Sequence, residues 1–246
     1  VKDLSGRKLD LKFTKAPKVK NGAWISDGSD MTLSGPSATQ LGIAENDDYT
    51  IIARCKTTRL NSSILFNLPG YYASNVRSSG ARGILLTPTY RDGNLYWDQD
   101  GHKGSTHRIL YNTKHMAPKM STYCLVRNSL GRHLYINGTL IKSTSDRGAP
   151  ITTINKPLEI FKISNKVPMP GAGDTFHGEL SHLMFYRVAL TTAEIKRVGR
   201  YVRNPYIIRD SSWDQALEQC SKTSAIMCDM DNICHAGKAF DPSKNA

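Results

Sequence analysis

The sequence predicts an all-β fold, a two-sheet antiparallel jelly-roll sandwich with a short helix after the last strand and a small cysteine-containing C-terminal unit. Short apolar or alternating runs recur from about residue 10 to about residue 190. Glycine, proline and asparagine turns separate these runs, and no long stretch of helical periodicity lies between them. Many short strands at regular spacing indicate antiparallel sheets and argue against a parallel α/β fold.

The expected strands are each bounded by turn residues, for example Asn21-Gly22, Pro69-Gly70 and Asp92-Gly93. In chain order, they are residues 10–13, 31–34, 49–54, 64–67, 83–87, 94–98, 122–127, 132–136, 139–143, 158–162 and 178–188.

Two local motifs are more specific than the strand pattern. Asn137-Gly138 lies between two apolar runs and supplies the positive φ angles of a type I′ turn, which predicts a two-residue hairpin. Thr191 and Glu194 have the spacing of a capping box, which predicts a helix beginning just before Ile195. This helix follows the last expected strand.

Composition places the chain among ordinary globular proteins. Of its 246 residues, 39% are hydrophobic and 22% are charged, which excludes a disordered or collagen-like class. The longest apolar runs, such as residues 83–86, have the length of strands. A membrane-spanning helix needs about 20 apolar residues, so the sequence predicts no membrane span.

The formal charge of +12 is unevenly distributed. Residues 211–246 carry three lysines and five acids, so residues 1–210 are strongly basic. Such a field attracts nucleic acid, acidic glycans, anionic lipid or an acidic neighbour in an assembly. The alternative is a solvated surface without a partner. No nucleic-acid motif with interleaved aromatic residues is found in the sequence.

Cysteines divide the chain into two parts. Cys55 and Cys124 lie in apolar runs, which is typical of buried free thiols. The other three crowd the acidic tail, and their spacing favours one disulfide and an odd thiol over a zinc site. The prediction is a sandwich over residues 1–205 and a small extension over residues 206–246, with disulfide candidates Cys220, Cys228 and Cys234.

Five motifs, in order, resemble the laminin-G-like, concanavalin-A-like jelly-roll family of the lectin/glucanase superfamily. The resemblance implies a binding fold for carbohydrates or extracellular partners, often one module of a larger adhesive or structural protein. It does not specify a ligand, because function lies in the loops and faces of the sandwich. The motifs are Asp3-Leu4-Ser5-Gly6, Gly28 before Met31-Thr32-Leu33, Asp48-Tyr49-Thr50-Ile51, Leu134-Tyr135-Ile136-Asn137-Gly138, and Phe176 to Leu180 continuing through Phe185 to Ile195.

Catalytic signatures are missing from the sequence. Glycoside hydrolases of this family carry Glu-x-Asp-x-x-Glu, and the nearest acid cluster here, residues 45–48, lacks that spacing. No serine-hydrolase elbow, phosphate-binding loop or zinc-protease motif is found. None of the seven histidines has a metal spacing, and simple alternation predicts that His177 and His182 point to opposite faces of their strand. We therefore predict that the chain is not an enzyme.

Aromatic and polar residues beside glycine turns are the candidates for a sugar site. A pyranose needs an aromatic surface together with fixed hydrogen-bonding groups. The predicted ligand-binding residues are Tyr71, Tyr72, Trp97, Asp98 and His102. Alternation places Tyr96 and Trp97 on opposite faces, so a core role for Trp97 is an open alternative to a platform role.

Two further kinds of site are expected. Relatives of the fold sometimes bind Ca²⁺ through loop carboxylates, and the resemblance nominates Asp27, Asp30 and Asp174, although these residues are also typical of turns. The glycosylation sequons are Asn61-Ser62-Ser63 and Asn137-Gly138-Thr139.

The functional prediction is a non-catalytic binding module for carbohydrate or for an extracellular or surface protein partner. If the positive charge of the chain takes part in binding, the partner is acidic. The alternative is a scaffold component of a larger assembly, such as a coat or minor capsid protein of a large virus. A divergent glycoside hydrolase is the third hypothesis. The expected location is extracellular, on the cell surface or in a virion.

Overall fold

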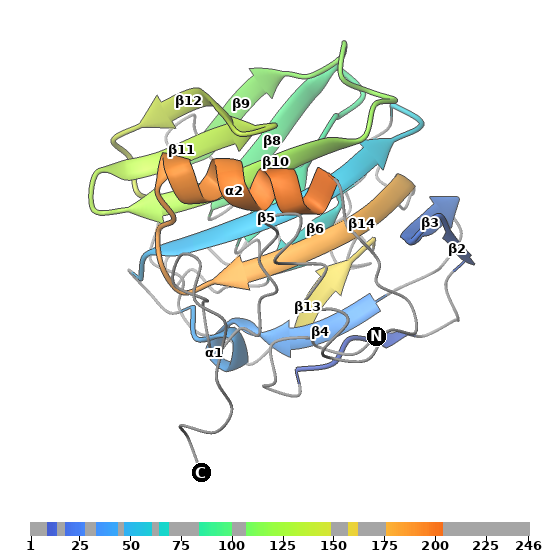
Figure 1. Ribbon diagram of the computed structural model, residues 1–246, viewed down its shortest axis with the longest axis horizontal. Coiled ribbons are helices and arrows are strands. Elements are labelled where there is room, and N and C mark those ends of the chain that lie inside the picture. Colours follow the sequence, from blue (N-terminus) through green and yellow to red (C-terminus); the bar gives the residue numbers. More distant parts are fainter. Residues whose placement is uncertain are drawn as a thin grey trace, which may run out of the picture.

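Two antiparallel sheets, each of seven strands among the described residues, stack face to face (Figure 1). This computed structural model describes residues 9–13, 18–27, 33–43, 47–60, 64–68, 84–99, 107–148, 157–161 and 176–203. The all-β, two-sheet prediction is confirmed.

Among the described strands of sheet A and of sheet B, half of the neighbouring pairs are not consecutive in the chain. Such neighbours require crossovers between the sheets, as in a jelly roll. Sheet A has the order β1 (Lys12–Phe13), β4 (Leu33–Ser37), β13 (Pro157–Ile160), β6 (Phe66–Leu68), β7 (Ile84–Thr87), β8 (Asn94–Gln99) and β9 (Arg108–Asn112). Sheet B has the order β12 (Thr139–Thr144), β11 (Gly131–Ile136), β10 (Ser121–Asn128), β5 (Tyr49–Thr57), β14 (His177–Tyr186), β3 (Ala23–Asp27) and β2 (Lys18–Lys20).

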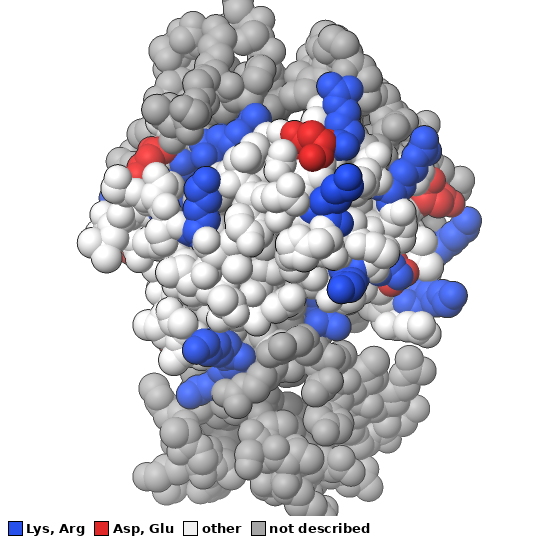
Figure 2. All heavy atoms as spheres, turned by 90° about the horizontal axis from the view of Figure 1, so that it is seen from above, with Lys and Arg blue, Asp and Glu red and all other residues white. Residues whose placement is uncertain are grey.

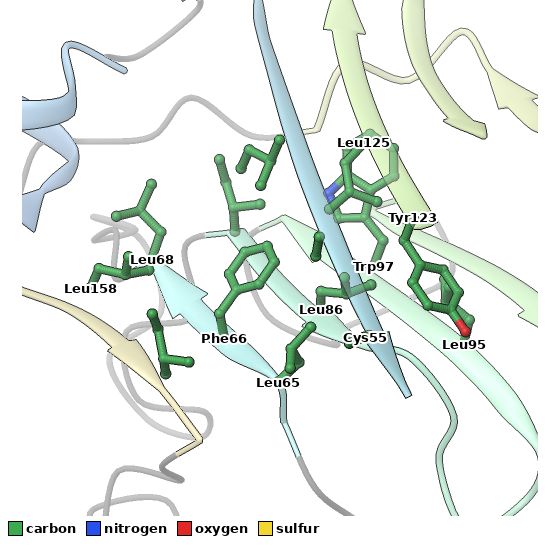
Figure 3. Close-up of a cluster of buried hydrophobic side chains, with 14 of the residues drawn as sticks. Cys55, Leu65, Phe66, Leu68, Leu86, Leu95, Trp97, Tyr123, Leu125 and Leu158 are labelled. Carbon is green, nitrogen blue, oxygen red and sulfur yellow. The ribbon is translucent and has the colours of Figure 1, made fainter. Parts of the chain in front are cut away.

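The core lies between the two sheets. Figure 3 shows Phe66, Leu86 and Trp97 from sheet A with Tyr123 and Leu125 from sheet B, all in one buried cluster. Alternate residues of each strand supply these side chains, as the two-residue period of a strand requires. Full burial of one such side chain contributes about 1.5–3 kcal/mol, so this cluster is the main source of stability.

Helix α2 (Thr192–Arg203) covers part of the outer face of sheet B (Figure 1). Its Ile195 packs on a second buried cluster with Ile52 and Val126. The predicted capping box is confirmed, because Thr191 N donates to Glu194 Oε2 at 2.7 Å and Glu194 N donates to Thr191 Oγ1 at 3.3 Å. A second helix, α1 (Ala38–Leu41), is a single turn after β4.

The predicted Asn-Gly hairpin is also confirmed. Asn137 and Gly138 have φ angles of 52° and 84° and join β11 to β12. Asn21 and Gly22, with φ angles of 51° and 74°, join β2 to β3 in the same way. From the sequence, that second pair is expected only to separate two segments, and the hairpin that it forms between β2 and β3 is not predicted.

The prediction that His177 and His182 face opposite ways is wrong. The register between β14 and β5 shifts between Leu180 and His182, so one extra residue enters the strand. Leu180 faces Cys55 on the inner side, whereas His182 is opposite Arg54, which alternates with Cys55 and lies on the outer side. The bulge shifts the inward–outward alternation of the strand by one residue, so both histidines lie on the outward face of sheet B.

Several expectations concern thiols, the tail and membranes. Cys55 and Cys124 are both buried free thiols, as predicted, and desolvation raises the pKa of each. The tail beyond residue 203, with Cys220, Cys228 and Cys234, lies outside the described residues, so the division at residue 205 stays a prediction. Among the helices that are described, none is long and apolar enough to cross a membrane.

Candidate functional site

The outward face of sheet A lies on the opposite side of the sandwich from α2 (Figure 1). On strands β7, β8 and β9 this face forms a small grid of side chains. Its rows follow the strand register: Asn94 beside Asn112, then Thr87, Tyr96 and Leu110, then Leu85, Asp98 and Arg108. Residues directly opposite on neighbouring strands share a face, so these groups lie within reach of one another.

Tyr96 is the centre of the grid and contacts three neighbours. Arg108 Cζ lies 4.5 Å from the centre of the Tyr96 ring, in a cation–π arrangement. The Tyr90 ring meets it edge to face, with 5.2 Å between ring centres. The Tyr96 hydroxyl donates to Asp92 Oδ2 at 2.5 Å. We name this surface the Tyr96 face, comprising Tyr90, Asp92, Asn94, Tyr96, Arg108 and Asn112.

The pKa values of Tyr96 and Asp92 follow from these contacts. Desolvation, supported by the hydrogen bond to Asp92, raises the pKa of Tyr96 to about 12. Desolvation acts to raise the pKa of Asp92, but hydrogen bonds from Tyr96 and Asn94 outweigh it and lower the pKa overall. At neutral pH, Tyr96 is therefore a protonated donor and Asp92 is an ionised acceptor. A phenol held in this state is a poor nucleophile.

A bidentate ion pair fixes the other end of the grid. Arg108 Nε donates to Asp98 Oδ1 at 2.5 Å, and Arg108 Nη2 donates to Asp98 Oδ2 at 2.7 Å. The Asp98 side chain is 1% exposed, although it points away from the core. Desolvation acts to lower the pKa of Arg108, and the Asp98 carboxylate more than offsets it. This fork geometry holds the guanidinium against the Tyr96 ring.

Two turns border the face at the Asn94–Asn112 end. Thr113 N donates to Gly93 O at 2.9 Å, which joins the turn before β8 to the turn after β9. Arg91 lies in the first turn, with Cζ 5.5 Å from the centre of the Tyr90 ring, and Lys114 lies in the second. Both cationic side chains are exposed.

The sequence-predicted sugar residues do not come together as one site. Trp97 is fully buried in the core, so the core alternative is correct for this residue and the platform alternative is wrong. Asp98 is buried and bound to Arg108, so it positions that side chain instead of facing solvent. Tyr71, Tyr72 and His102 lie outside the described residues.

The metal and glycosylation candidates are described only in part. Asp27 is exposed and forms an ion pair with Lys18 at 3.1 Å, while Asp30, Asp174 and Asn61 lie outside the described residues. No group of three or more His, Cys, Asp or Glu side chains that could hold a metal occurs in the described part of the chain. Asn137 is exposed at its turn, and its Oδ1 accepts from Thr122 N at 2.9 Å.

A separate polar cluster closes one end of the sandwich. Arg132 is fully buried and donates from Nη2 to Asp146 Oδ2 at 2.7 Å and from Nη1 to His107 O at 3.1 Å. Its Cζ lies 5.4 Å from the Trp97 ring centre, and the equally buried Arg127 lies on the adjacent strand. These contacts connect β11 of sheet B to β8 of sheet A and to the residue just before β9, which is a structural role.

Sequence reasoning missed most of the Tyr96 face. Alternation did identify Tyr96 as opposite to Trp97 in β8, and this is confirmed. Arg108 and Asn112 belong to β9, which the expected strands omit. The run Arg108-Ile109-Leu110-Tyr111 was the available signal, because a short continuous apolar run of branched and aromatic residues is typical of a strand.

Comparison with known families gives the class of protein. The model of the concanavalin A-like lectin/glucanases superfamily matches residues 27–196, which is more than half of the chain. The chain therefore belongs to this superfamily, as its sequence motifs suggested. Among curated protein sequences, no match is found.

Solved structures with a similar fold include domains from larger proteins. The binding domain of Paraclostridial Mosquitocidal Protein 1 is 21% identical, with a TM-score of 0.54, and the match covers 82% of this chain and 50% of that one. The binding domain of botulinum neurotoxin DC in complex with rat synaptotagmin II is 13% identical, with a TM-score of 0.59 and coverages of 80% and 48%. Trypanosoma rangeli sialidase in complex with sialic acid is 15% identical, with a TM-score of 0.57 and coverages of 79% and 30%.

These similarities establish the fold alone, because all three identities are low. The chain spans half or less of the length of each structure. Its superfamily nevertheless includes both lectins and glucanases, and two of the three similar structures are described as binding domains.

Proposed function

We propose that this chain is a non-catalytic carbohydrate-binding module, and that the Tyr96 face is part of its binding surface. The observation that supports this most directly is the fixed combination of half-buried tyrosine rings and polar groups on an outward sheet face. Aromatic surface suits the C–H side of a pyranose, while the Asn94 and Asn112 amides suit its hydroxyls.

Preorganisation favours this surface as a binding site. Tyr96 is held by Arg108, Tyr90 and Asp92, so little side-chain freedom is lost when a ligand binds. Immobilising a flexible side chain costs about 0.5–1.5 kcal/mol, and that cost is already met here. The sheet beneath the site is equally fixed, because Trp97 anchors β8 in the core.

A non-catalytic role agrees with the state of the carboxylates. Hydrolysis of a glycosidic bond needs a pair of carboxyl groups that act on the substrate. On the Tyr96 face, Asp98 is bound by Arg108, and Asp92 accepts from Tyr96 and from Asn94 N. The superfamily's enzyme motif Glu-x-Asp-x-x-Glu is also missing from the sequence.

The remaining sequence candidates stay part of the proposal. Tyr71, Tyr72 and His102 are proposed to extend the sugar site, and Asp27, Asp30 and Asp174 are proposed as Ca²⁺ ligands. We also propose an extracellular or surface location, which is supported by the toxin binding domains of similar fold.

A glycan array probed with and without chelator tests the proposal. Tyr96→Ala should lose binding, while Tyr186→Ala, a half-buried tyrosine on sheet B, serves as the matched control. Loss of binding on chelation would support the aspartate site, whereas unchanged binding would count against calcium. If the wild-type chain binds no glycan in either condition, the carbohydrate proposal is wrong.

A protein partner is the second candidate function. One structure of similar fold, the botulinum neurotoxin DC binding domain, is in complex with rat synaptotagmin II.

The scaffold hypothesis is tested by measuring the assembly state of the chain at low and high salt, since a charge-driven assembly dissociates as screening increases. An unchanged monomer under both conditions would count against it.

A further inference from the structure

We propose that the ligand of the Tyr96 face is an anionic polysaccharide, and that Arg91 and Lys114 recognise its carboxylate or sulfate groups. This inference rests on the proposed function and specifies its ligand class. Arg91 and Lys114 lie in the two joined turns at one end of the face. A Cβ placed on Gly93 would lie 2.9 Å from Lys114 Cβ, so the Lys114 side chain starts directly beside the Arg91 turn.

The acids of the face are already engaged by other groups. Asp98 accepts two hydrogen bonds from Arg108, and Asp92 accepts from the Tyr96 hydroxyl and from Asn94 N. Among the described residues, no carboxylate lies within the 4.0 Å ion-pair distance of Arg91 or Lys114. The face and its bordering turns therefore carry three cations and two carboxylates. Their net charge is positive, and an anionic ligand would neutralise it.

The spacing suits a sugar chain that lies along the strand. From the Asn94 row to the Tyr96 row is about 7 Å, two residues of an extended strand. One sugar could contact the Tyr96 ring while an acidic group of the next reaches the two cations. Arg91 presents a planar guanidinium that fits a carboxylate or sulfate, and Lys114 adds a point charge.

General positive charge is the main competing explanation. Figure 2 shows Lys and Arg side chains spread over one side of the molecule, with fewer Asp and Glu. A chain with a formal charge of +12 attracts any polyanion to some extent. The test therefore compares two variants that lose the same number of charges at different places.

Binding is measured to three soluble polymers: polygalacturonate, which is carboxylated, dextran sulfate, and neutral dextran. The test variant is Arg91→Gln with Lys114→Gln. The control variant is Lys196→Gln with Arg197→Gln, which removes two exposed cations from α2 on the opposite side. We expect the wild-type chain to bind one or both anionic polymers, and the two anionic arms distinguish carboxylate from sulfate recognition.

The test variant should bind the anionic polymer at least about tenfold more weakly, because one or two charge-assisted hydrogen bonds to the polymer are lost. The control should stay within about threefold of wild type, as expected for exposed charges that lie away from the ligand. Equal losses in both variants, or no loss in either, would overturn the inference. Glycan-array binding that needs Tyr96 but involves only neutral sugars would overturn it while leaving the proposed function intact.

Discussion

Replacing Arg108 by methionine should destabilise the fold mainly through the carboxylate that it leaves behind. Asp98 is 1% exposed and accepts both of its bonds to Arg108 at 2.5 and 2.7 Å. Removing one partner of a buried ion pair costs about 3–5 kcal/mol, and the 24% exposure of Arg108 places the cost near 3 kcal/mol. With an m-value of about 2–3 kcal/mol/M in urea, the midpoint should fall by about 1–1.5 M.

A double-mutant cycle separates this cost from the loss of apolar packing. Asp98→Asn alone should cost about 2 kcal/mol, because Arg108 is left without its carboxylate partner. The double variant carries neither charge, so its cost should be about 2 kcal/mol less than the sum of the single costs. Urea denaturation followed by circular dichroism at pH 7 measures all four proteins. Additive costs, or an Arg108→Met cost below about 1 kcal/mol, would refute the argument.

Four other predictions concern the core, α2 and sheet B. Trp97→Ala should cost about 3–5 kcal/mol by creating a cavity, and a cost below 1 kcal/mol in thermal or urea unfolding would contradict its core position. Thr191→Ala should cost about 1 kcal/mol by removing the helix cap, measured by urea unfolding at pH 7, and a cost within experimental error would contradict the cap. Hydrogen bonds from Thr191 lower the pKa of Glu194 from its ordinary value of 4.5. The ionised carboxylate therefore stabilises the fold above pH 4.5, and this stabilisation should be lost as the pH falls below that value. The Glu194→Gln variant should not show this loss. Desolvation, with Arg54 nearby, lowers the pKa of His182. As the pH falls below 6.5 the unfolded chain takes up a proton before the folded chain does, so the free energy of unfolding should decrease there. His182→Asn should flatten that slope, and parallel pH profiles of the variant and the wild-type chain would contradict this assignment.

Strand β8 shows which features a sequence can predict. Alternation alone divides its residues between the core and the outward face, because both sides of the strand keep a strict period of two. It therefore separates Tyr96 from Trp97 correctly. The burial of Asp98 does not follow from alternation, since it depends on Arg108, a residue ten positions later on a strand that the pattern did not reveal.

Strand β14 shows where the same reasoning fails. The extra residue at Ser181 leaves only an ambiguous mark in the apolar pattern, because the three-residue spacing from Leu180 to Leu183 also fits a change of periodicity. Only the pairing with β5 shows that the chain continues as a strand, with its alternation shifted by one residue. Registers and bulges arise from long-range pairing, so a candidate site that spans several strands cannot be assembled from local spacing.

The Tyr96 face and the core are coupled through β8. Trp97 points inward, where its ring lies 5.4 Å from the Arg132 guanidinium, and Gln99 accepts from the Tyr49 hydroxyl at 2.7 Å across the sandwich. The outward residues Tyr96 and Asp98 alternate with these two anchors, so the backbone that carries them is fixed from the opposite side. A sheet face fixed in this way can bind a flexible sugar chain without ordering its own side chains, which leaves the ligand's entropy as the main cost of association.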